Sequence, residues 1–187
     1  EALLMAGFAL VPSLLPQLSQ RWSLSATAGG WLGGIFFLGY ILAVPVLVSL
    51  TDRIDARRIY LAGATVSALA LAGFASFADG LASGLCWWWL AGLGLAGTYM
   101  PGLKALTDRL PVAVQARGTA FYTATFGVGA GLSYLWIGLL QERLPWPGLF
   151  AIAAVCAALS MLLVWCGIAP GKPLAAMPVG HSHWRSV

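Results

Sequence analysis

Long apolar stretches alternate with short polar turns along the whole of the 187-residue chain. The stretches cover residues 2–18, 26–50, 59–78, 81–106, 118–140 and 147–168. An α-helix needs about 20 apolar residues to cross the hydrocarbon core of a bilayer, and most of the stretches reach that length. The pattern therefore predicts an all-α membrane protein with six transmembrane helices, forming one bundle over residues 1–169.

The two ends of the chain differ from the middle. The first stretch is short, starts at Glu1 and contains Pro12 and Pro16, which we expect to interrupt its helix. We interpret it as a truncated first helix, and no basic segment of a cleaved signal peptide precedes it. After the sixth stretch, Pro and Gly residues begin a polar tail, residues 170–187, which we expect to be a cytoplasmic linker to further sequence.

Most basic residues fall at one end of the predicted helices, in every second loop. Only Arg21 and Arg143 of the ten Lys and Arg residues fall on one side. The other eight are Arg53, Arg57, Arg58, Lys104, Arg109, Arg117, Lys172 and Arg185. Because cytoplasmic loops retain positive charge, this asymmetry predicts that both termini are cytoplasmic, in an inner or plasma membrane. The net charge of +4 then follows from topology, and we expect no nucleic-acid partner.

The composition fits a membrane bundle, since 60% of the residues are hydrophobic and only 9% are charged. The 23 glycines allow helices to approach closely in lipid. All six acidic residues lie at expected helix ends or in loops, so we predict no carboxylate at mid-membrane, where a proton relay needs one. They are Glu1, Asp52, Asp55, Asp79, Asp108 and Glu142.

The sequence offers little catalytic chemistry. Cys86, Cys156 and Cys166 lie in apolar helices without metal-ligand spacing, and we interpret them as buried free thiols. His181 and His183 form a pair in the tail, too few ligands for a metal site. There is no phosphate-binding loop and no convincing Ser/His/Asp set. We therefore expect no catalytic residue, no bound metal, no cofactor and no enzymatic activity.

The loop after the second stretch carries the strongest motif. Four of its residues match the pattern G-x-L-A-D-R-x-G-R-K in register, namely Leu50, Asp52, Arg53 and Arg57. Val48, Asp55 and Ala56 depart from it, in place of two glycines and one basic residue. This pattern is the signature of the loop between helices 2 and 3 in the major facilitator superfamily, which the chain resembles. The alternative is that a short cytoplasmic loop simply collects arginines.

Later segments extend this resemblance. Trp88 stands at the arginine position of the family pattern R-x-x-x-G-x-G-x-G, followed by Gly92, Gly94 and Gly97. The next loop contains Asp108, Pro111 and Arg117, similar to D-x-x-P and R-G-R-A. The fifth stretch departs at Ser133, Tyr134 and Ile137 from the G-P-x-x-G-G pattern of proton-coupled drug exporters. Lys104, a turn before Asp108, either extends to the interface or contacts an anionic substrate.

The resemblance implies the N-terminal half of a transporter in which two six-helix bundles enclose a substrate path and rock against each other. Its partners would be the lipid bilayer, a small-molecule solute with or without a coupling ion, and the missing C-terminal half. Charged residues at cytoplasmic helix ends would form contacts specific to one conformation. These gating candidates are Asp52, Arg53, Arg57, Arg58, Asp108 and Arg117.

Helices 1, 2, 4 and 5 line the substrate path in this family. The candidates on them are Gln17, Tyr40, Thr98, Tyr99, Tyr122 and Thr125, which can also hydrogen-bond neighbouring helices instead. Two other hypotheses stay open: a complete six-helix transporter that works as a homodimer, and a membrane scaffold or enzyme that transports nothing. The sequence identifies neither the substrate nor the direction of transport nor a coupling ion.

Overall fold

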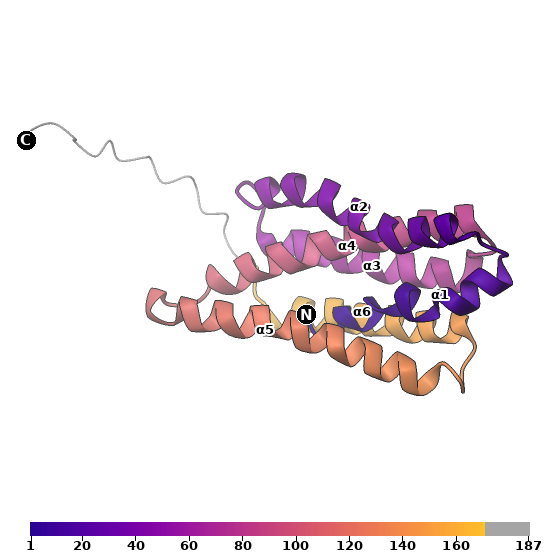
Figure 1. Cartoon of the computed structure of the whole chain (residues 1–187). Coiled ribbons are helices and arrows are strands. Elements are labelled where there is room, and N and C mark those ends of the chain that lie inside the picture. The colour runs from indigo at the N-terminus through magenta and orange to yellow at the C-terminus, as the bar shows by residue number, and fades with distance from the viewer. Residues whose placement is uncertain (171–187) are drawn as a thin grey trace, which may run out of the picture.

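The computed structural model describes residues 1–170, and in this part of the chain every regular element is helical. One turn of 3₁₀-helix, η1 (Leu4–Gly7), precedes α1 (Leu10–Arg21). Five longer helices follow: α2 (Ala26–Leu50), α3 (Ala56–Phe77), α4 (Leu81–Thr107), α5 (Val112–Leu140) and α6 (Trp146–Gly167). They lie side by side and alternate in direction (Figure 1). The expected linker, with Lys172, Arg185 and the histidine pair, lies outside the described residues.

The prediction of an all-α membrane fold is confirmed, but the count of six spans is not. Within residues 1–170, four helices are long and apolar enough to cross a membrane: α2, α3, α5 and α6. The α4 helix has 27 residues, which is long enough to cross a bilayer, but it is not among these four. The α1 helix has only 12 residues and is too short to span a bilayer by itself.

The first stretch is broken at a different place from the one expected. The helix α1 continues through Pro16 to Arg21, and Pro12 lies in its first turn, where a backbone N–H needs no helical partner. The expectation that these prolines interrupt the helix is therefore wrong. The break lies earlier, between η1 and α1, where Ala9 leaves the helical region with φ −93° and ψ 5°.

Side chains of α5 satisfy the backbone at this break. The Ser133 hydroxyl accepts a hydrogen bond from the Ala9 N–H at 3.1 Å and donates one to the Ala6 carbonyl at 2.9 Å. The Trp136 indole also donates to the Ala6 carbonyl, at 3.1 Å. Backbone groups inside a membrane have no water to bond, so such contacts are what permit irregular backbone there. Side chains of α5 thus stabilise the break between η1 and α1.

Glycines bring α4 into direct backbone contact with α2 and α3. A Cβ atom added at Gly97 would lie 2.9 Å from the Cα of Gly63 in α3, and one at Gly92 would collide with the Phe36 carbonyl in α2. Such close approach is the usual basis of helix association in lipid, where apolar burial from water is absent. The helices α2, α3 and α4 therefore form the tightly packed part of the bundle, and α6 packs on α3.

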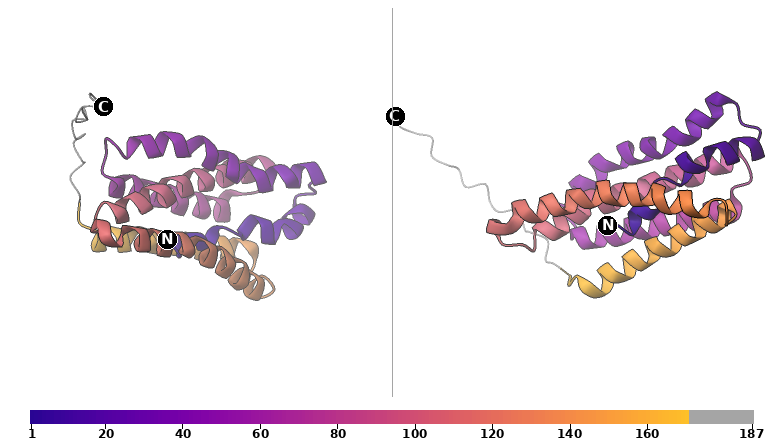
Figure 2. Two further views of the ribbon diagram at one scale, coloured as in Figure 1. Left: turned by 60° about the vertical axis from the view of Figure 1, so that its left-hand side comes forward. Right: turned by 60° about the horizontal axis from the view of Figure 1, so that its bottom comes forward.

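The turns between helices gather at two opposite ends of the bundle (Figure 2). One end holds the turns α1–α2, α3–α4 and α5–α6, with Arg21 and Arg143. The other holds the turns α2–α3 and α4–α5 and the end of α6, with the other basic residues of the described part. The structure therefore separates the charges by end, and which end faces the cytoplasm stays a prediction.

Candidate functional site

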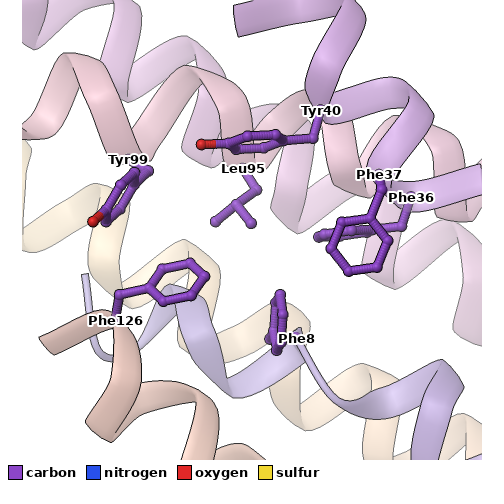
Figure 3. A pocket seen from close by; sticks show the side chains of 7 residues that line it. All are labelled: Phe8, Phe36, Phe37, Tyr40, Leu95, Tyr99 and Phe126. Atoms are coloured by element: carbon purple, nitrogen blue, oxygen red, sulfur yellow. The ribbon is translucent and has the colours of Figure 1, made fainter. Parts of the chain in front are cut away.

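A cavity of about 170 Å³ opens between the η1–α1 junction, α2, α4 and α5 (Figure 3). Six of its seven lining side chains are aromatic: Phe8, Phe36, Phe37, Tyr40, Leu95, Tyr99 and Phe126. The Tyr40 side chain extends across Leu95 toward Tyr99, and the phenyl rings close the opposite side (Figure 3). The walls of the cavity are thus mostly aromatic rings, and Tyr40 and Tyr99 are the lining residues that carry a hydroxyl group.

The broken first segment forms one wall of this cavity. Phe8 lies at the junction of η1 and α1, and its ring meets those of Phe36 at 6.0 Å and Phe126 at 5.7 Å, both edge to face. Across the cavity, the rings of Tyr99 and Phe126 lie 5.1 Å apart. Such edge-to-face pairs are favourable geometries for aromatic rings. Phe8 lies where the helix is interrupted, so the break places one of the side chains that line the cavity.

A carboxylate lies beside the cavity, contrary to expectation. The Tyr122 hydroxyl donates to Glu1 Oε2 at 3.1 Å, and the Tyr122 ring lies 5.7 Å from the ring of Tyr99. The N-terminus lies about halfway along the bundle next to α5 in all views (Figures 1 and 2). The prediction that no carboxylate lies at this depth is therefore wrong for Glu1. Its Oε1 atom is buried and has no hydrogen-bond partner among the described residues.

The expected substrate-lining residues divide into two groups. Tyr40 and Tyr99 line the cavity, and Tyr122 lies behind Tyr99, with its hydroxyl 3.0 Å from the Tyr99 carbonyl oxygen. The other three lie elsewhere. Thr98 is fully buried and donates to the Leu95 carbonyl, Thr125 donates to the Tyr122 carbonyl, and Gln17 is exposed on α1.

Sequence reasoning missed the phenylalanines of the cavity. Tyr40 lies one turn after Phe36 and Phe37 on α2, and Phe126 lies one turn after Tyr122 on α5. Residues three or four apart share one face of a helix, so the aromatic spacing on these helices was an available signal. Phe8 gave no such signal, because its position depends on the break before α1.

A second, smaller cavity of about 20 Å³ adjoins the first and shares Phe8, Phe36 and Leu95 with it. Trp88 lines this cavity and is only 1% exposed. Its indole nitrogen is buried and has no hydrogen-bond partner in the described part of the chain. The residue at the family's arginine position is therefore an interior aromatic side chain that carries no charge.

At one end of the bundle, a group of charged side chains ties three helices together. Asp55 caps α3 by accepting from the Arg57 N–H at 3.0 Å, and its carboxylate lies 3.5 Å from the Arg109 guanidinium. Arg109 also donates to the Ala169 carbonyl at 3.0 Å, beyond the end of α6. Arg57, 8% exposed, donates to the Trp165 carbonyl at 2.8 Å. These contacts join the start of α3, the end of α4 and the end of α6.

Only Arg57 of the expected gating residues belongs to this group. Arg53 and Arg58 are exposed, and so is Asp52, whose carboxylate has no ion pair or hydrogen bond within residues 1–170. Asp108 pairs with Lys104 at 3.4 Å, and the Arg117 guanidinium lies 5.7 Å from the centre of the Phe121 ring. Asp55 and Arg109, which the motif comparison left out, make the contacts between helices.

The cysteines differ from the expectation. Cys86 and Cys166 are exposed on the outside of the bundle and Cys156 is half-buried, so the prediction of buried thiols is wrong. All three are free. Among the described residues no three His, Cys, Asp or Glu side chains come together as a metal site would require. The chemistry of this bundle is therefore concentrated at the aromatic cavity and at the Asp55–Arg109 group.

Apolar helices around a cavity at mid-depth are typical of an integral membrane transporter. The sequence model of the Major Facilitator Superfamily matches residues 2–186, and the chain belongs to this family of membrane transporters. It is 28% identical over 183 residues to a probable multidrug-efflux transporter of Mycobacterium tuberculosis, covering 93% of this chain and 37% of that protein. It is also 28% identical over 178 residues to the uncharacterized MFS-type transporter YceJ of Bacillus subtilis, covering 89% of this chain and 43% of that protein. The chain thus spans about two-fifths of the length of these relatives.

Proposed function

We propose that this chain is the N-terminal half of a secondary transporter that moves a small solute across a cytoplasmic membrane by alternating access. The observation that carries the proposal is the aromatic cavity, which lies between the η1–α1 junction, α2, α4 and α5, with lining residues such as Tyr40, Leu95 and Phe126 near the middle of their helices. Substrate sites of secondary transporters lie near the membrane midplane, where discontinuous helices contribute to them. The broken segment at Phe8 has this character.

A second bundle is part of the proposal, because the chain covers only 37% to 43% of relatives that match most of its length. Large apolar side chains are exposed along α2 and α5, the helices on either side of the cavity. They include Phe37, Ile41, Leu42, Val46, Phe121, Val128, Leu132 and Leu135. Such a surface suits lipid or a second bundle and would not persist in water. The two bundles would enclose the solute between them.

The conformational change would open the cavity to one side of the membrane at a time. Contacts at helix ends can hold one conformation and break in the other. We assign this role to the group formed by Asp55, Arg57 and Arg109, joined by Asp52 when the bundles reorient. The end that carries this group faces the cytoplasm in our proposal, since it also holds most of the Lys and Arg residues of the described part.

The solute fits an apolar, aromatic environment better than a polar one. Small-molecule sites bind by apolar and aromatic walls with few polar groups, and the Phe and Tyr rings here form such walls. The name of the mycobacterial relative, a probable multidrug-efflux transporter, supports a solute of this kind. We therefore propose drug-like apolar solutes as the first class to assay, with efflux as the direction.

The test is solute flux in liposomes. The 187-residue segment is reconstituted alone, together with the separately expressed remainder of its transporter, and as the intact protein. We expect flux from the intact protein and from the two parts combined, and none from the segment alone, because one bundle cannot close the path on both sides. Flux from the segment alone at the rate of the intact protein would instead support the homodimer, and no flux from any preparation would contradict the transport function.

A further inference from the structure

We propose that a groove between α2, α3 and α4 binds one anionic phospholipid, with an acyl chain in the groove and the headgroup phosphate at Arg58. The groove has a volume of about 310 Å³, and its walls include Leu47, Ala62, Val66 and Leu93. Among the described residues that line it, Arg58 is the only one with a charge, and the others are apolar or glycine. This lipid site is separate from the aromatic cavity and does not depend on which solute is transported.

The sequence opens this groove because the two halves of α2 pack differently. The first half lies against α4, since a Cβ atom added at Gly39 would collide with the Trp89 carbonyl. Pro45 follows inside the same helix. A proline in a helix interior removes one backbone hydrogen bond and bends the helix. Beyond it, the second half of α2 diverges from α3 and α4 (Figure 1), and Leu47 and Leu50 line the space.

The α4 helix separates the groove from the aromatic cavity. Leu95 and Tyr99 of α4 line the cavity, whereas Leu93 and Gly97 line the groove. Residues two apart point about 200° away from each other around a helix, so the two spaces lie on opposite faces of α4. The α3 helix lines the groove and contributes no side chain to the wall of the cavity. The groove therefore lies away from the proposed solute path.

The length of the groove matches one leaflet of a bilayer. Along α3 it runs from Arg58, in the first turn of the helix, to Val66. Eight residues of helix rise about 12 Å, and half of the hydrocarbon core is about 15 Å thick. The groove thus extends from the end of the bundle almost to the membrane centre, as an acyl chain of one leaflet does. Gly63 and Gly97 line it without a side chain that would obstruct the chain.

The charges at the end of the groove favour an anionic headgroup. Arg58 is exposed and makes no ion pair or hydrogen bond within residues 1–170, and Arg53 is exposed in the adjoining turn. Of the acidic residues at this end, Asp55 is paired with Arg109, and Asp52 does not line the groove. A guanidinium binds phosphate through charge-assisted hydrogen bonds, and basic residues beside a membrane attract anionic lipids.

Other occupants fit the groove less well. A zwitterionic lipid would bring a second cation beside Arg58, which weakens the attraction. A helix of a second protein is too wide, because 310 Å³ spread over about 12 Å gives a mean cross-section of roughly 26 Å², far below that of a helix about 10 Å across. A single acyl chain needs only a narrow apolar channel. Its burial and the phosphate contact at Arg58 would hold the lipid at both ends of the groove.

The test is native mass spectrometry of the intact transporter, titrated in detergent with dioleoylphosphatidylglycerol or with dioleoylphosphatidylcholine, which has the same acyl chains. We expect phosphatidylglycerol to bind about fivefold more tightly, the factor that one basic residue contributes toward anionic lipid. Arg58→Gln removes the charge and keeps most of the side chain, so the two lipids should then bind within about twofold of each other. Arg143→Gln, the same change at the opposite end of the bundle, should keep the preference.

Ala62→Trp tests the groove itself, because an indole there fills the space of the acyl chain. Both lipids should bind at least about tenfold more weakly, since losing the burial of two methylene groups already accounts for that factor. Ala151→Trp, the same change on the exposed surface of α6, should bind both lipids as the wild type does.

Equal binding of the two lipids by the wild-type protein would overturn the inference, as would a preference that survives in Arg58→Gln. Equal loss of the preference in Arg58→Gln and Arg143→Gln would mean that phosphatidylglycerol responds to the overall charge and has no site at Arg58. Wild-type lipid binding by Ala62→Trp would exclude an acyl chain from the groove. If the measured mass then showed a smaller oligomer, a second copy of the chain would be the occupant instead.

Discussion

The Asp55 carboxylate and the Arg109 guanidinium lie 3.5 Å apart and connect the start of α3 with the end of α4. Arg109 also reaches the Ala169 carbonyl, so one ion pair links three parts of the chain. The family signature has glycine where this chain has Asp55. The contact is therefore a feature of this chain that the generic motif does not contain, at the end of the bundle where we place the conformational contacts.

We expect Asp55→Asn to slow transport by the intact protein about fivefold at unchanged expression, because a partly exposed ion pair contributes about 1 kcal/mol to the conformation that holds it. Initial rates of solute flux in liposomes measure the effect. Glu142→Gln, at the opposite end of the bundle, is the control and should transport at the wild-type rate. Unchanged flux in Asp55→Asn would limit this ion pair to a structural role.

Asp52 tests a different idea, because it matches the family signature but has no ion pair or hydrogen bond in the described structure. If Asp52 forms its contacts only after the bundles reorient, Asp52→Asn should impair flux in the intact protein while leaving membrane insertion intact. Arg53→Ala and Arg57→Ala should be harmful in the same assay. Wild-type rates in all three variants would mean that these charged residues affect only the orientation of the chain in the membrane.

Filling the cavity should stop transport without unfolding the bundle. Leu95 projects into the cavity from α4, so Leu95→Trp places an indole where the solute is proposed to bind. We expect flux to fall at least about tenfold, while the melting temperature changes little because the added volume enters an existing space. Leu69→Trp, on the exposed face of α3, adds the same side chain outside the cavity and should keep wild-type flux. Normal flux through Leu95→Trp would place the substrate path elsewhere.

The helices α2 to α6 were predictable because their apolar stretches are long and the turns between them are polar. The stretch 26–50 coincides with α2, and the later ones agree with α3 to α6 within a few residues, except that α5 begins six residues earlier, at Val112. The break before α1 was not predictable, because side chains of α5 stabilise it. Pro12 and Pro16, the visible helix breakers, lie inside a continuous helix. The site depends on that break, so Phe8 and Glu1 could not be assigned from sequence alone.

Ser133 provides a direct test of how the broken segment is held. Ser133→Ala removes the acceptor of the Ala9 N–H and a donor to the Ala6 carbonyl, both inside the bundle. Leaving a buried backbone group unsatisfied costs about 1–3 kcal/mol, so the variant should unfold at a lower temperature in detergent. Ser49→Ala loses only a bond from its hydroxyl to the Val46 carbonyl of its own helix, and should melt close to the wild type. Equal melting of both variants would show that the segment is held by packing alone.

The orientation of the bundle follows from the distribution of basic residues and can be read by cysteine labelling in cells. Asp79 and Glu142 are exposed at one end of the bundle. Ala113 is exposed near the other end, where Asp55 is partly exposed. Because cytoplasmic loops retain positive charge, cysteines at positions 79 and 142 should react with a membrane-impermeant maleimide from outside. Cysteines at positions 55 and 113 should react only after the membrane is opened. The three native cysteines are replaced first, since Cys86 and Cys166 are exposed on the surface of the bundle. Labelling of position 55 in intact cells would reverse the orientation, and with it the cytoplasmic placement of the Asp55–Arg109 contact.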